Sequence, residues 1–372
     1  MHATDPALQL LIDRVRAAHA AGAQLRVRGG GSKDFYGETA QGELLDTRVL
    51  EGISSYEPTE LVVTARCGTS LAELEALLET KGQCLAFEPP HFGSAASSLQ
   101  ERGATVGGMI ACGLSGPARA VAGSVRDHVL GVTMLNGRGE VLTFGGQVMK
   151  NVAGYDVSRL LAGSLGCLGL IVEASLKVTP IAAATLTLRM EMDDRRAIAK
   201  LNEWAGLPLP LNASAVWAGH AIVRLRGAVA AVQAARQRLG GEVVEPAAAR
   251  AFWDGLRDHT DEYFVNAHAA VARGAALWRL SVPSAATLAP TSGDMLIEWG
   301  GAQRWLCSDM PATVVRDIAA QAGGHASLFR SADKSPGVFA PLQSPLDRIH
   351  RELKKSFDPN GIFNPGRLYP GL

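Results

Sequence analysis

The sequence predicts an α+β protein with two domains, and three observations carry this prediction. The chain has 372 residues, which is long for a single core. Hydrophobic residues make up 47% and charged residues 19%, the balance of a globular protein. Glycines crowd into residues 103–169, whereas ordinary strand and helix periodicity follows Pro180. We therefore predict one domain over residues 1–182, a second over 183–340, and a C-terminal helix and tail, 341–372, that return to the first domain.

The first half of the chain alternates predicted helices and strands. Apolar residues at helical spacing, followed by Gly22, predict a helix near its start. Ser70 and Glu73 match a capping box ahead of another helix, and residues 136–139 predict a hairpin turn. The elements expected here are helices over 11–20 and 71–81 and strands over 25–28, 61–65, 129–135, 140–144 and 172–178.

The second half follows the order strand, helix, strand, strand, helix, strand, which is the ferredoxin-like unit. Its strands are expected over 185–192, 212–217, 221–226 and 242–245, with one helix capped by Asp193 or Asp194 and running to Trp204, and another over 229–239. A second copy is expected from strands over 277–282, 295–299, 304–307 and 326–330 and a helix over 312–322. This copy is weaker, because no helix is evident after its first strand. Such a double unit is expected to form a lid or substrate domain.

Charge and cysteine content argue against several protein classes. Lys+Arg and Asp+Glu both total 36, so the chain lacks the basic balance typical of a nucleic-acid-binding protein. The 5 cysteines contain no C-x-x-C pair, which excludes the usual zinc and iron–sulfur spacings within this chain. No apolar run reaches transmembrane length, and the first residues lack the order of a signal peptide. A cytoplasmic protein is therefore expected.

A glycine-rich loop follows the predicted strand over 25–28. Arg28 precedes three consecutive glycines, and Ser32 and Lys33 come next. The main-chain N–H groups of such a loop can turn inward and bind an anion, with the three polar side chains as further donors. A diphosphate fits this loop, and a flexible surface turn fits its glycines equally well. The P-loop and G-x-G-x-x-G patterns are both missing, which disfavours a plain NAD-binding protein.

A second glycine-rich run covers residues 105–117 and consists almost entirely of small residues. It lets the main chain approach a flat or extended ligand closely, although a tightly packed turn has the same composition. Two such loops in one domain favour a dinucleotide that lies between them.

Further motifs make the pattern specific. They are Gly-Gly-Gly-Ser at 29–32, Pro-Pro at 89–90, Thr-Val-Gly-Gly at 105–108, Lys-Asn-x-x-Gly-Tyr-Asp at 150–156, Gly-Ser-x-Gly-x-Leu-Gly at 163–169, and Phe-Asp-Pro with Phe-Asn-Pro-Gly-Arg between 357 and 367. Together they resemble the vanillyl-alcohol-oxidase (PCMH-type) family of FAD-binding proteins, over residues 20–180 and the C-terminal tail. Within that family, residues 115–119 and 145–157 are most similar to FAD-binding subunits of glycolate oxidase.

The resemblance implies FAD between two α+β subdomains, with the ferredoxin-like units as a cap. It implies that residues 29–33 hold the pyrophosphate, that residues 105–119 follow the ribityl chain and the flavin edge, and that Pro89 borders the ring. The C-terminal helix, from residue 344 to about 356, would bring Asn364 towards the ring. The implied cofactor-binding residues are Arg28, Gly29, Gly30, Gly31, Ser32, Lys33, Pro89, Thr105, Gly107, Gly108, Ala111, Cys112, Gly113, Ser115, Gly116, Pro117, Arg119, Gly169, Ile171 and Asn364.

The chain departs from its relatives in two ways. Relatives with covalent flavin carry a histidine in the first loop, whereas residues 31–33 are Gly-Ser-Lys, so a noncovalent FAD is expected. Relatives that oxidise D-2-hydroxy acids carry a His-x-His metal cluster in the cap. The 9 histidines here include no such spacing, so no metal is expected.

Oxidation of an α-hydroxy acid requires a cation for the carboxylate and a base for the hydroxyl proton. Five arginines on the predicted cap strands are candidates for the cation, and two histidines at strand edges are candidates for the base. Most of the arginines are better explained as solvated charges on a strand face, and a histidine in a turn at a strand edge is ordinary. The candidates are Arg224, Arg226, Arg279, Arg304 and Arg330, and His220 and His325. The sequence alone assigns no catalytic residue.

The resemblance implies a subunit of a multi-chain glycolate (2-hydroxy-acid) oxidase that makes glyoxylate. It would work with a second, similar FAD-binding subunit and an iron–sulfur subunit, and any membrane contact would come through these partners. Two alternatives remain open: a self-sufficient FAD-dependent 2-hydroxy-acid dehydrogenase, and an assembly subunit whose flavin does not turn over.

Overall fold

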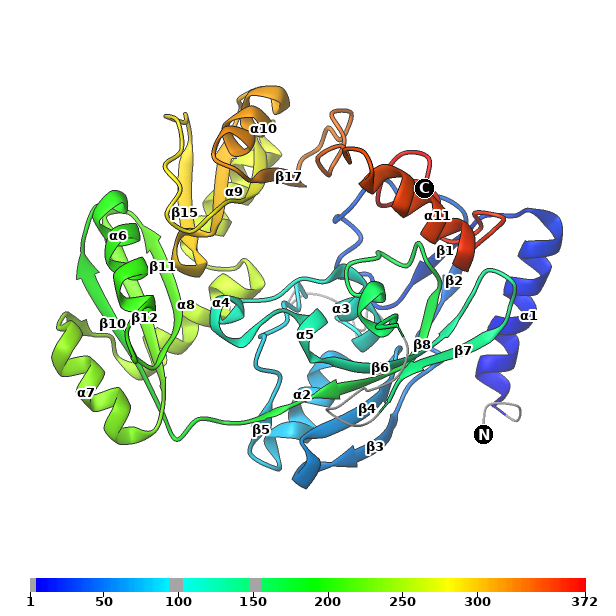
Figure 1. Cartoon of the computed structure of the whole chain (residues 1–372), viewed down its shortest axis with the longest axis horizontal. Helices are drawn as coiled ribbons and strands as arrows, with labels where there is room; N and C mark the ends of the chain where they lie inside the picture. Colours follow the sequence, from blue (N-terminus) through cyan, green and yellow to red (C-terminus); the bar gives the residue numbers. More distant parts are fainter. Residues whose placement is uncertain (1–4, 94–102, 147–154) are drawn as a thin grey trace.

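The computed structural model describes residues 5–93, 103–146 and 155–372 (Figure 1). The N-terminal half is built on a five-stranded antiparallel sheet in the order β3-β4-β8-β6-β7. These strands are β3 (Ile53–Glu57), β4 (Val62–Arg66), β6 (Val129–Leu135), β7 (Val141–Gly145) and β8 (Leu170–Lys177). The predicted hairpin is confirmed, because β6 and β7 pair directly across the turn at 136–140.

A smaller parallel sheet joins the two ends of the chain. β1 (Leu25–Arg28) pairs with β2 (Glu43–Asp46), and Leu25 also bridges to Phe363. The helix α1 (Pro6–Ala21) precedes β1, begins at an Asp5 cap and ends at Gly22 in the left-handed region. The predicted helix is confirmed and starts earlier than the periodicity indicated.

The helix α2 (Leu71–Glu79) forms where predicted, but the capping box is wrong. Ser70 stands at the N-cap with no side-chain hydrogen bond to the helix. Its backbone is extended and pairs with Thr105, which joins α2 to the start of α3 (Val106–Cys112). Short elements complete this half: α4 (Arg119–Ala122), α5 (Val125–His128), the turns η2 (Pro58–Glu60) and η3 (Ser158–Leu161), and the β5 (Gln83–Cys84) pair with β9 (Thr179–Pro180).

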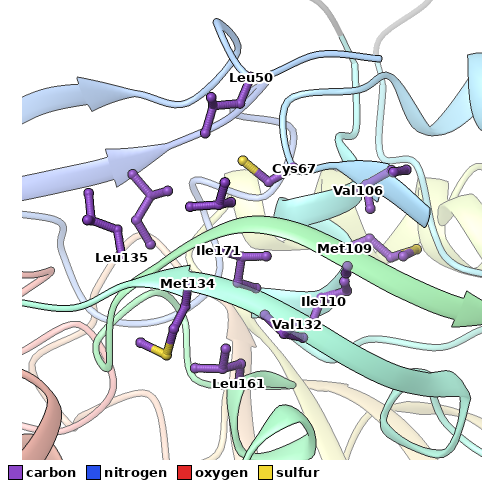
Figure 2. Packing of buried hydrophobic residues seen from close by; sticks show 14 of the residues in the cluster. Leu50, Cys67, Val106, Met109, Ile110, Val132, Met134, Leu135, Leu161 and Ile171 are labelled. Atoms are coloured by element: carbon purple, nitrogen blue, oxygen red, sulfur yellow. The ribbon is translucent and has the colours of Figure 1, made fainter. Parts of the chain in front are cut away.

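The core of this half fixes the orientation of α3. Val106, Met109 and Ile110 of α3 are buried in one cluster with β6 and β8 residues such as Val132 and Ile171 (Figure 2). These three positions share one face of a helix, so Gly107, Gly108, Ala111 and Cys112 lie towards other faces. The apolar face of α3 therefore determines where its small residues point.

The second half contains one eight-stranded antiparallel sheet in the order β13-β10-β12-β11-β15-β16-β14-β17, which we call the cap domain. Its strands are β10 (Ala184–Glu191), β11 (Leu211–Trp217), β12 (His220–Gly227), β13 (Glu242–Val243), β14 (Ala276–Ser281), β15 (Asp294–Glu298), β16 (Gln303–Ser308) and β17 (His325–Arg330). Each set of four consecutive strands has the ferredoxin-like order, and β11 and β15 join the two sets. The predicted pair of units is confirmed, and the second unit has no helix between its first two strands.

Helices cover the two faces of the cap sheet unequally. On one face, α6 (Asp194–Ala205), α7 (Val229–Leu239) and α10 (Ala312–Gln321) pack on residues such as Ile297 and Leu306. On the other face, α8 (Pro246–Asp258) and α9 (Glu262–Ala272) pack on alternate residues such as Leu296 and Trp305. The helices α8 and α9 were not predicted from the sequence.

The second face is also where the cap meets the N-terminal half. The cluster that contains Leu296 and Trp305 also contains Tyr36, Leu114 and Leu165 from the N-terminal half. The last helix, α11 (Leu346–Phe357), carries the chain back to the N-terminal half, as Figure 1 shows. The Lys354 ammonium anchors it with hydrogen bonds of 2.7 Å to two main-chain carbonyls and to Asp358.

Candidate functional site

A pocket lies where the loop after β1 meets α3, and most of the predicted cofactor residues line it. These are Arg28, Gly29, Gly30, Gly31, Ser32, Lys33, Thr105, Gly107, Gly108, Ala111, Cys112, Gly169, Ile171 and Asn364. Seven residues that were not predicted from the sequence line the same pocket: Val27, Asp34, Thr47, Cys67, Leu165, Gly166 and Arg367. Leu165, Gly166 and Arg367 belong to motifs that were recognised, whereas nothing in the sequence marks Thr47 or Cys67.

The loop after β1 offers unpaired donors to this pocket. No described residue accepts a hydrogen bond from the main-chain N–H groups of residues 29–33. Gly31 has φ 81°, and the Arg28 guanidinium occupies the place where its Cβ would lie. Arg28 in turn donates to Asp34 at 2.6 Å. The loop therefore has the open N–H groups of an anion-binding concavity.

Lys33 adds a buried positive charge. Lys33 is 8% exposed, and among the described residues its ammonium contacts Ser32 Oγ, 3.4 Å away, and the face of the Phe92 ring, 5.5 Å from the ring centroid. Burial lowers the pKa of Lys33. No carboxylate of the described chain forms an ion pair with it. A buried ammonium without a counterion favours an anionic ligand such as a phosphate.

Close main-chain contacts explain the glycines. A Cβ on Gly29 would lie 2.4 Å from Thr105 Oγ1, and one on Gly107 would lie 2.7 Å from the Cβ of Cys67. Thr105 also caps α3 by accepting a hydrogen bond of 3.2 Å from Gly108 N–H. Only glycine allows the two loops to approach this closely, and the resulting cradle fits a thin, extended ligand.

Asn364 fastens the C-terminal tail to the wall of the pocket. Its Oδ1 accepts from Val27 N–H at 2.8 Å, and its Nδ2 donates to the Leu165 carbonyl at 2.6 Å. Arg367 lies on the same tail and donates to main-chain carbonyls of Asp34, at 2.8 Å, and Glu38. The tail therefore helps to shape the loop that carries Lys33.

The remaining predicted residues lie outside this pocket. Ser115, Gly116 and Pro117 line a second cavity of about 20 Å³ between the N-terminal half and the cap. Gly113 ends α3 in the left-handed region and packs on Gly163.

Two further predicted residues line neither cavity. Pro89 is buried, and its neighbour Pro90 borders the second cavity instead. The Arg119 guanidinium stacks on the Trp299 ring at 4.6 Å.

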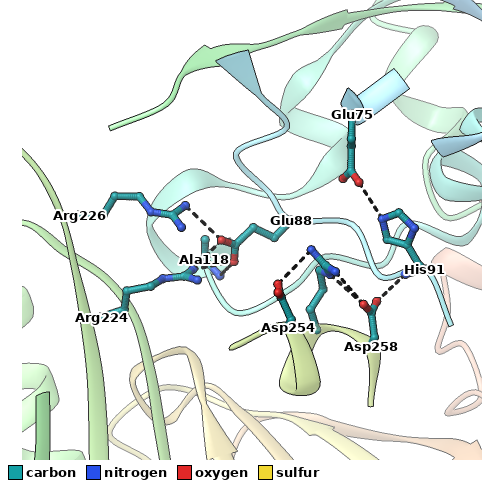
Figure 3. Close-up of polar contacts among 9 residues, drawn as sticks. Glu75, Glu88, His91, Ala118, Arg224, Arg226, Asp254 and Asp258 are labelled. Carbon is teal, nitrogen blue, oxygen red and sulfur yellow. Dashed lines mark hydrogen bonds and ion pairs between the residues drawn. The ribbon is translucent and has the colours of Figure 1, made fainter. Parts of the chain in front are cut away.

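The structure separates the five candidate arginines of the cap. Arg224 and Arg226 both donate to the Glu88 carboxylate (Figure 3). Arg304 donates to main-chain carbonyls of Gly301 and Ala286. All three already have partners within the chain, which explains their positions without a ligand.

Arg279 and Arg330 differ from the other three. Arg279 donates to the Tyr36 hydroxyl at 3.3 Å, and Arg330 stacks on the Phe35 ring at 3.4 Å. Neither forms an ion pair with a described carboxylate, and the Nε of Arg330 is buried without a partner. Burial lowers the pKa of Arg330 to about 10. These two cations face aromatic side chains where the halves meet, and no carboxylate in the described part of the chain pairs with them.

The two candidate histidines do not lie in either cavity described above. His220 Nδ1 donates to the Ala218 carbonyl at 2.9 Å, and His325 belongs to the edge strand β17. His259 and His268, which the sequence analysis did not single out, each have a buried ring nitrogen without a partner. Burial and the nearby Arg330 hold the pKa of His259 well below its usual value, so this ring is neutral.

No three His, Cys, Asp or Glu side chains in the described ranges are grouped so that they could hold a metal ion. Within the same ranges, no helix is long and apolar enough to span a bilayer. The recognised motif at 150–156 falls largely outside the described residues.

Sequence comparisons agree with the cofactor prediction. Residues 8–145 match the FAD binding domain family FAD_binding_4. Glycolate oxidase subunit GlcE of Escherichia coli (strain K12) is 46% identical over 364 residues, which cover 98% of each chain. Glycolate oxidase subunit GlcD of Bacillus subtilis (strain 168) is 28% identical over 203 residues, covering 48% of this chain and 41% of that protein. D-lactate dehydrogenase of Anaerostipes hadrus is 31% identical over 147 residues, covering 40% and 29%.

The fold has relatives among solved structures. Alkyldihydroxyacetonephosphate synthase superposes with a TM-score of 0.65 at 15% identity, covering 98% of this chain and 75% of that one. The predicted fold class and the prediction of FAD as cofactor are therefore confirmed.

Proposed function

The chain belongs to the family of glycolate oxidase subunit GlcE, and on that premise we propose that it holds noncovalent FAD in a multi-chain oxidase that converts glycolate to glyoxylate. The observation that carries the proposal is the identity of 46% over 98% of both chains, together with the cradle around Lys33. The proposal treats the chain as a working part of an oxidoreductase.

The residues of the first pocket suit the diphosphate of FAD. The open N–H groups of residues 29–33 would hold the diphosphate oxygens. The Lys33 ammonium, which has no carboxylate partner among the described residues, would neutralise part of the negative charge of the diphosphate. The glycines at 29 and 107 give the cofactor main-chain contact. When bound, FAD supplies the acceptor for the two electrons of the substrate.

The cap supplies the groups for an anionic substrate. Arg279 and Arg330 are the two cap candidates without a carboxylate partner in the described chain, and they lie where the cap meets the N-terminal half. We assign the substrate carboxylate to this pair. The buried rings of Tyr36 and Phe329 contact Arg279, and the half-buried rings of Phe35 and Phe92 contact Arg330, which lowers the local dielectric and strengthens a charge-assisted hydrogen bond.

The proposed partners are a second FAD-binding subunit and an iron–sulfur subunit. The 5 cysteines of this chain are all free and none is paired for a cluster, so we assign any iron–sulfur cluster of the complex to another chain. Partial identity to subunit GlcD supports a related flavoprotein as one partner.

An anaerobic titration with glycolate and with D-lactate tests the proposal. We expect the flavin of this chain to bleach in the assembled complex. Bleaching of the isolated chain would instead identify a self-sufficient 2-hydroxy-acid dehydrogenase. A flavin that neither substrate reduces in either state, in a chain still required for the complex, would identify an assembly subunit, and a chain that binds no FAD would refute the proposal.

A further inference from the structure

A buried carboxyl group borders the cavity between the two halves, and the proposed function does not yet use it. Glu298 ends β15, is 3% exposed, and lines the cavity of about 20 Å³ together with Ser115–Pro117. This volume admits one hydroxyl-sized group. A carboxyl group that borders a small cavity can exchange a proton with a group that enters the cavity.

The two oxygens of Glu298 have different surroundings. Oε2 accepts hydrogen bonds from Trp305 Nε1 at 2.6 Å and from Gln303 Nε2 at 3.0 Å. Oε1 has no hydrogen-bond partner among the described residues, and this atom is not fully buried. The side chain is therefore held through one oxygen while the other remains available.

The basic groups around Glu298 do not stabilise its charged form. Arg257 of α8 lines the same cavity, but it is already paired with Asp258 and Asp254. His259 is neutral, and Arg279 of β14 donates to Tyr36.

No described cation forms an ion pair with Glu298. Burial, with smaller contributions from the carboxylates of Asp261 and Glu88, raises the pKa of Glu298 from 4.5 to about 7, against the two hydrogen bonds to Oε2.

We propose that Glu298 is the catalytic residue that takes the hydroxyl proton of the 2-hydroxy acid. Oε1 accepts this proton as the hydrogen on the α-carbon leaves with its electron pair to FAD, and the C–O bond becomes the carbonyl of the oxo acid. The proton then passes to solvent, and the acceptor chain of the complex reoxidises the flavin. The inference rests on the proposed function, because that function supplies both the substrate and the oxidant.

Other titratable groups at this cavity are less suited to the role. His259 also has a free ring nitrogen, but burial and two neighbouring arginines disfavour its protonated form. A general base functions best when its pKa lies close to the working pH. Glu298 is the cavity residue that combines a free acceptor atom with such a pKa.

Glu298→Gln tests the inference in the assembled complex. We expect the rate of anaerobic flavin reduction by glycolate to fall roughly 10²–10⁴-fold. In the unaltered complex this rate should rise with pH through about pH 7, and in Glu298→Gln this rise should be lost. Glu262→Gln removes an exposed carboxylate nearby, on α9, and should leave both unchanged. Wild-type reduction in Glu298→Gln would overturn the inference and leave the proposed function standing, whereas a wild-type complex that glycolate cannot reduce would overturn both.

A second readout needs no turnover. The indole N–H resonance of Trp305, which donates to Oε2, should titrate with a midpoint near pH 7 and should not titrate in Glu298→Gln. A resonance that is flat between pH 5 and pH 9 in the wild type would overturn the inference. Should Glu298→Gln fail to fold, Trp305→Phe removes one donor to the carboxylate and should move the pH profile of flavin reduction to higher pH; an unmoved profile would overturn the inference as well.

Discussion

Glu88 and Arg224 form a buried ion pair that joins the two halves of the molecule. Nη2 of Arg224 on β12 donates to both oxygens of Glu88 at 2.7 Å, and the side chains are 5% and 15% exposed respectively. Glu88 also accepts from Ala118 N–H at 3.1 Å, directly after the Gly116–Pro117 turn. One carboxylate therefore fixes both the cap and the loop that borders the inter-domain cavity.

Glu88→Gln should destabilise the protein strongly. It leaves the Arg224 guanidinium buried without a counterion, and breaking such a pair costs about 3–5 kcal/mol. Urea unfolding of the variant should show this loss. The matched control is Glu242→Gln, because the Arg189–Glu242 pair is 49% and 65% exposed and is worth less than about 1 kcal/mol. Equal losses in the two variants would contradict the importance of burial at Glu88.

Gly107→Ala should abolish retention of FAD. The new Cβ would lie 2.7 Å from the Cβ of buried Cys67, so α3 must move away from its seat against β4 and β8. Gly206→Ala is the control, since the nearest heavy atom there is 3.5 Å away. Flavin absorbance per protein after gel filtration measures retention. A Gly107→Ala protein that keeps its full flavin content would move the cofactor away from α3.

Lys33→Met should weaken FAD binding while preserving the fold. A hydrogen bond to a charged group contributes about 1.5–3 kcal/mol, so affinity should fall roughly 10- to 150-fold. Titration of the deflavinated protein with FAD, at low and high salt, measures this loss, which should shrink at high salt because ions screen the attraction. Lys200→Met, at an exposed pair with Glu203, should bind FAD normally. If the Lys33→Met protein binds FAD with unchanged affinity, the diphosphate does not lie against Lys33.

Glu298→Gln should alter how stability depends on pH. Between pH 4.5 and about 7 the folded protein holds a proton on Glu298 that the unfolded chain has released, so stability falls as pH rises through this window. At about 1.4 kcal/mol per pH unit, the accumulated loss is of order 3 kcal/mol. The variant lacks this titration, so its unfolding free energy relative to wild type should increase from pH 5 to pH 8. Parallel curves for the two proteins would show that Glu298 titrates normally.

Local patterns predicted most of the regular structure. The turn residues at 136–139 fix the β6–β7 hairpin, and apolar spacing fixes α1 and the cap strands. The helix α3 was harder to predict, because residues 105–113 contain three glycines, which disfavour a helix. The structure forms it because burial of Val106, Met109 and Ile110 outweighs that low propensity.

Some residues of the candidate site could be predicted from the sequence, and others could not. Glycines and charged residues adjacent in sequence, such as those at 28–33, were found because one loop carries them all. The five cap arginines are equivalent in sequence, and only the distant Glu88 distinguishes Arg224 and Arg226 from Arg279. Nothing in the sequence marks Glu298 as a site residue, because a glutamate at the end of a strand is ordinary unless its side chain is known to be buried.

The contacts between β1 and the C-terminal tail determine when the cofactor site is completed during synthesis. Leu25 pairs with Phe363, while Asn364 and Arg367 line the pocket whose loop is encoded more than three hundred residues earlier. On the ribosome, the glycine-rich loop therefore emerges long before the residues that complete its wall. The complete wall of the flavin pocket can therefore form only after residues 364–367 have left the exit tunnel.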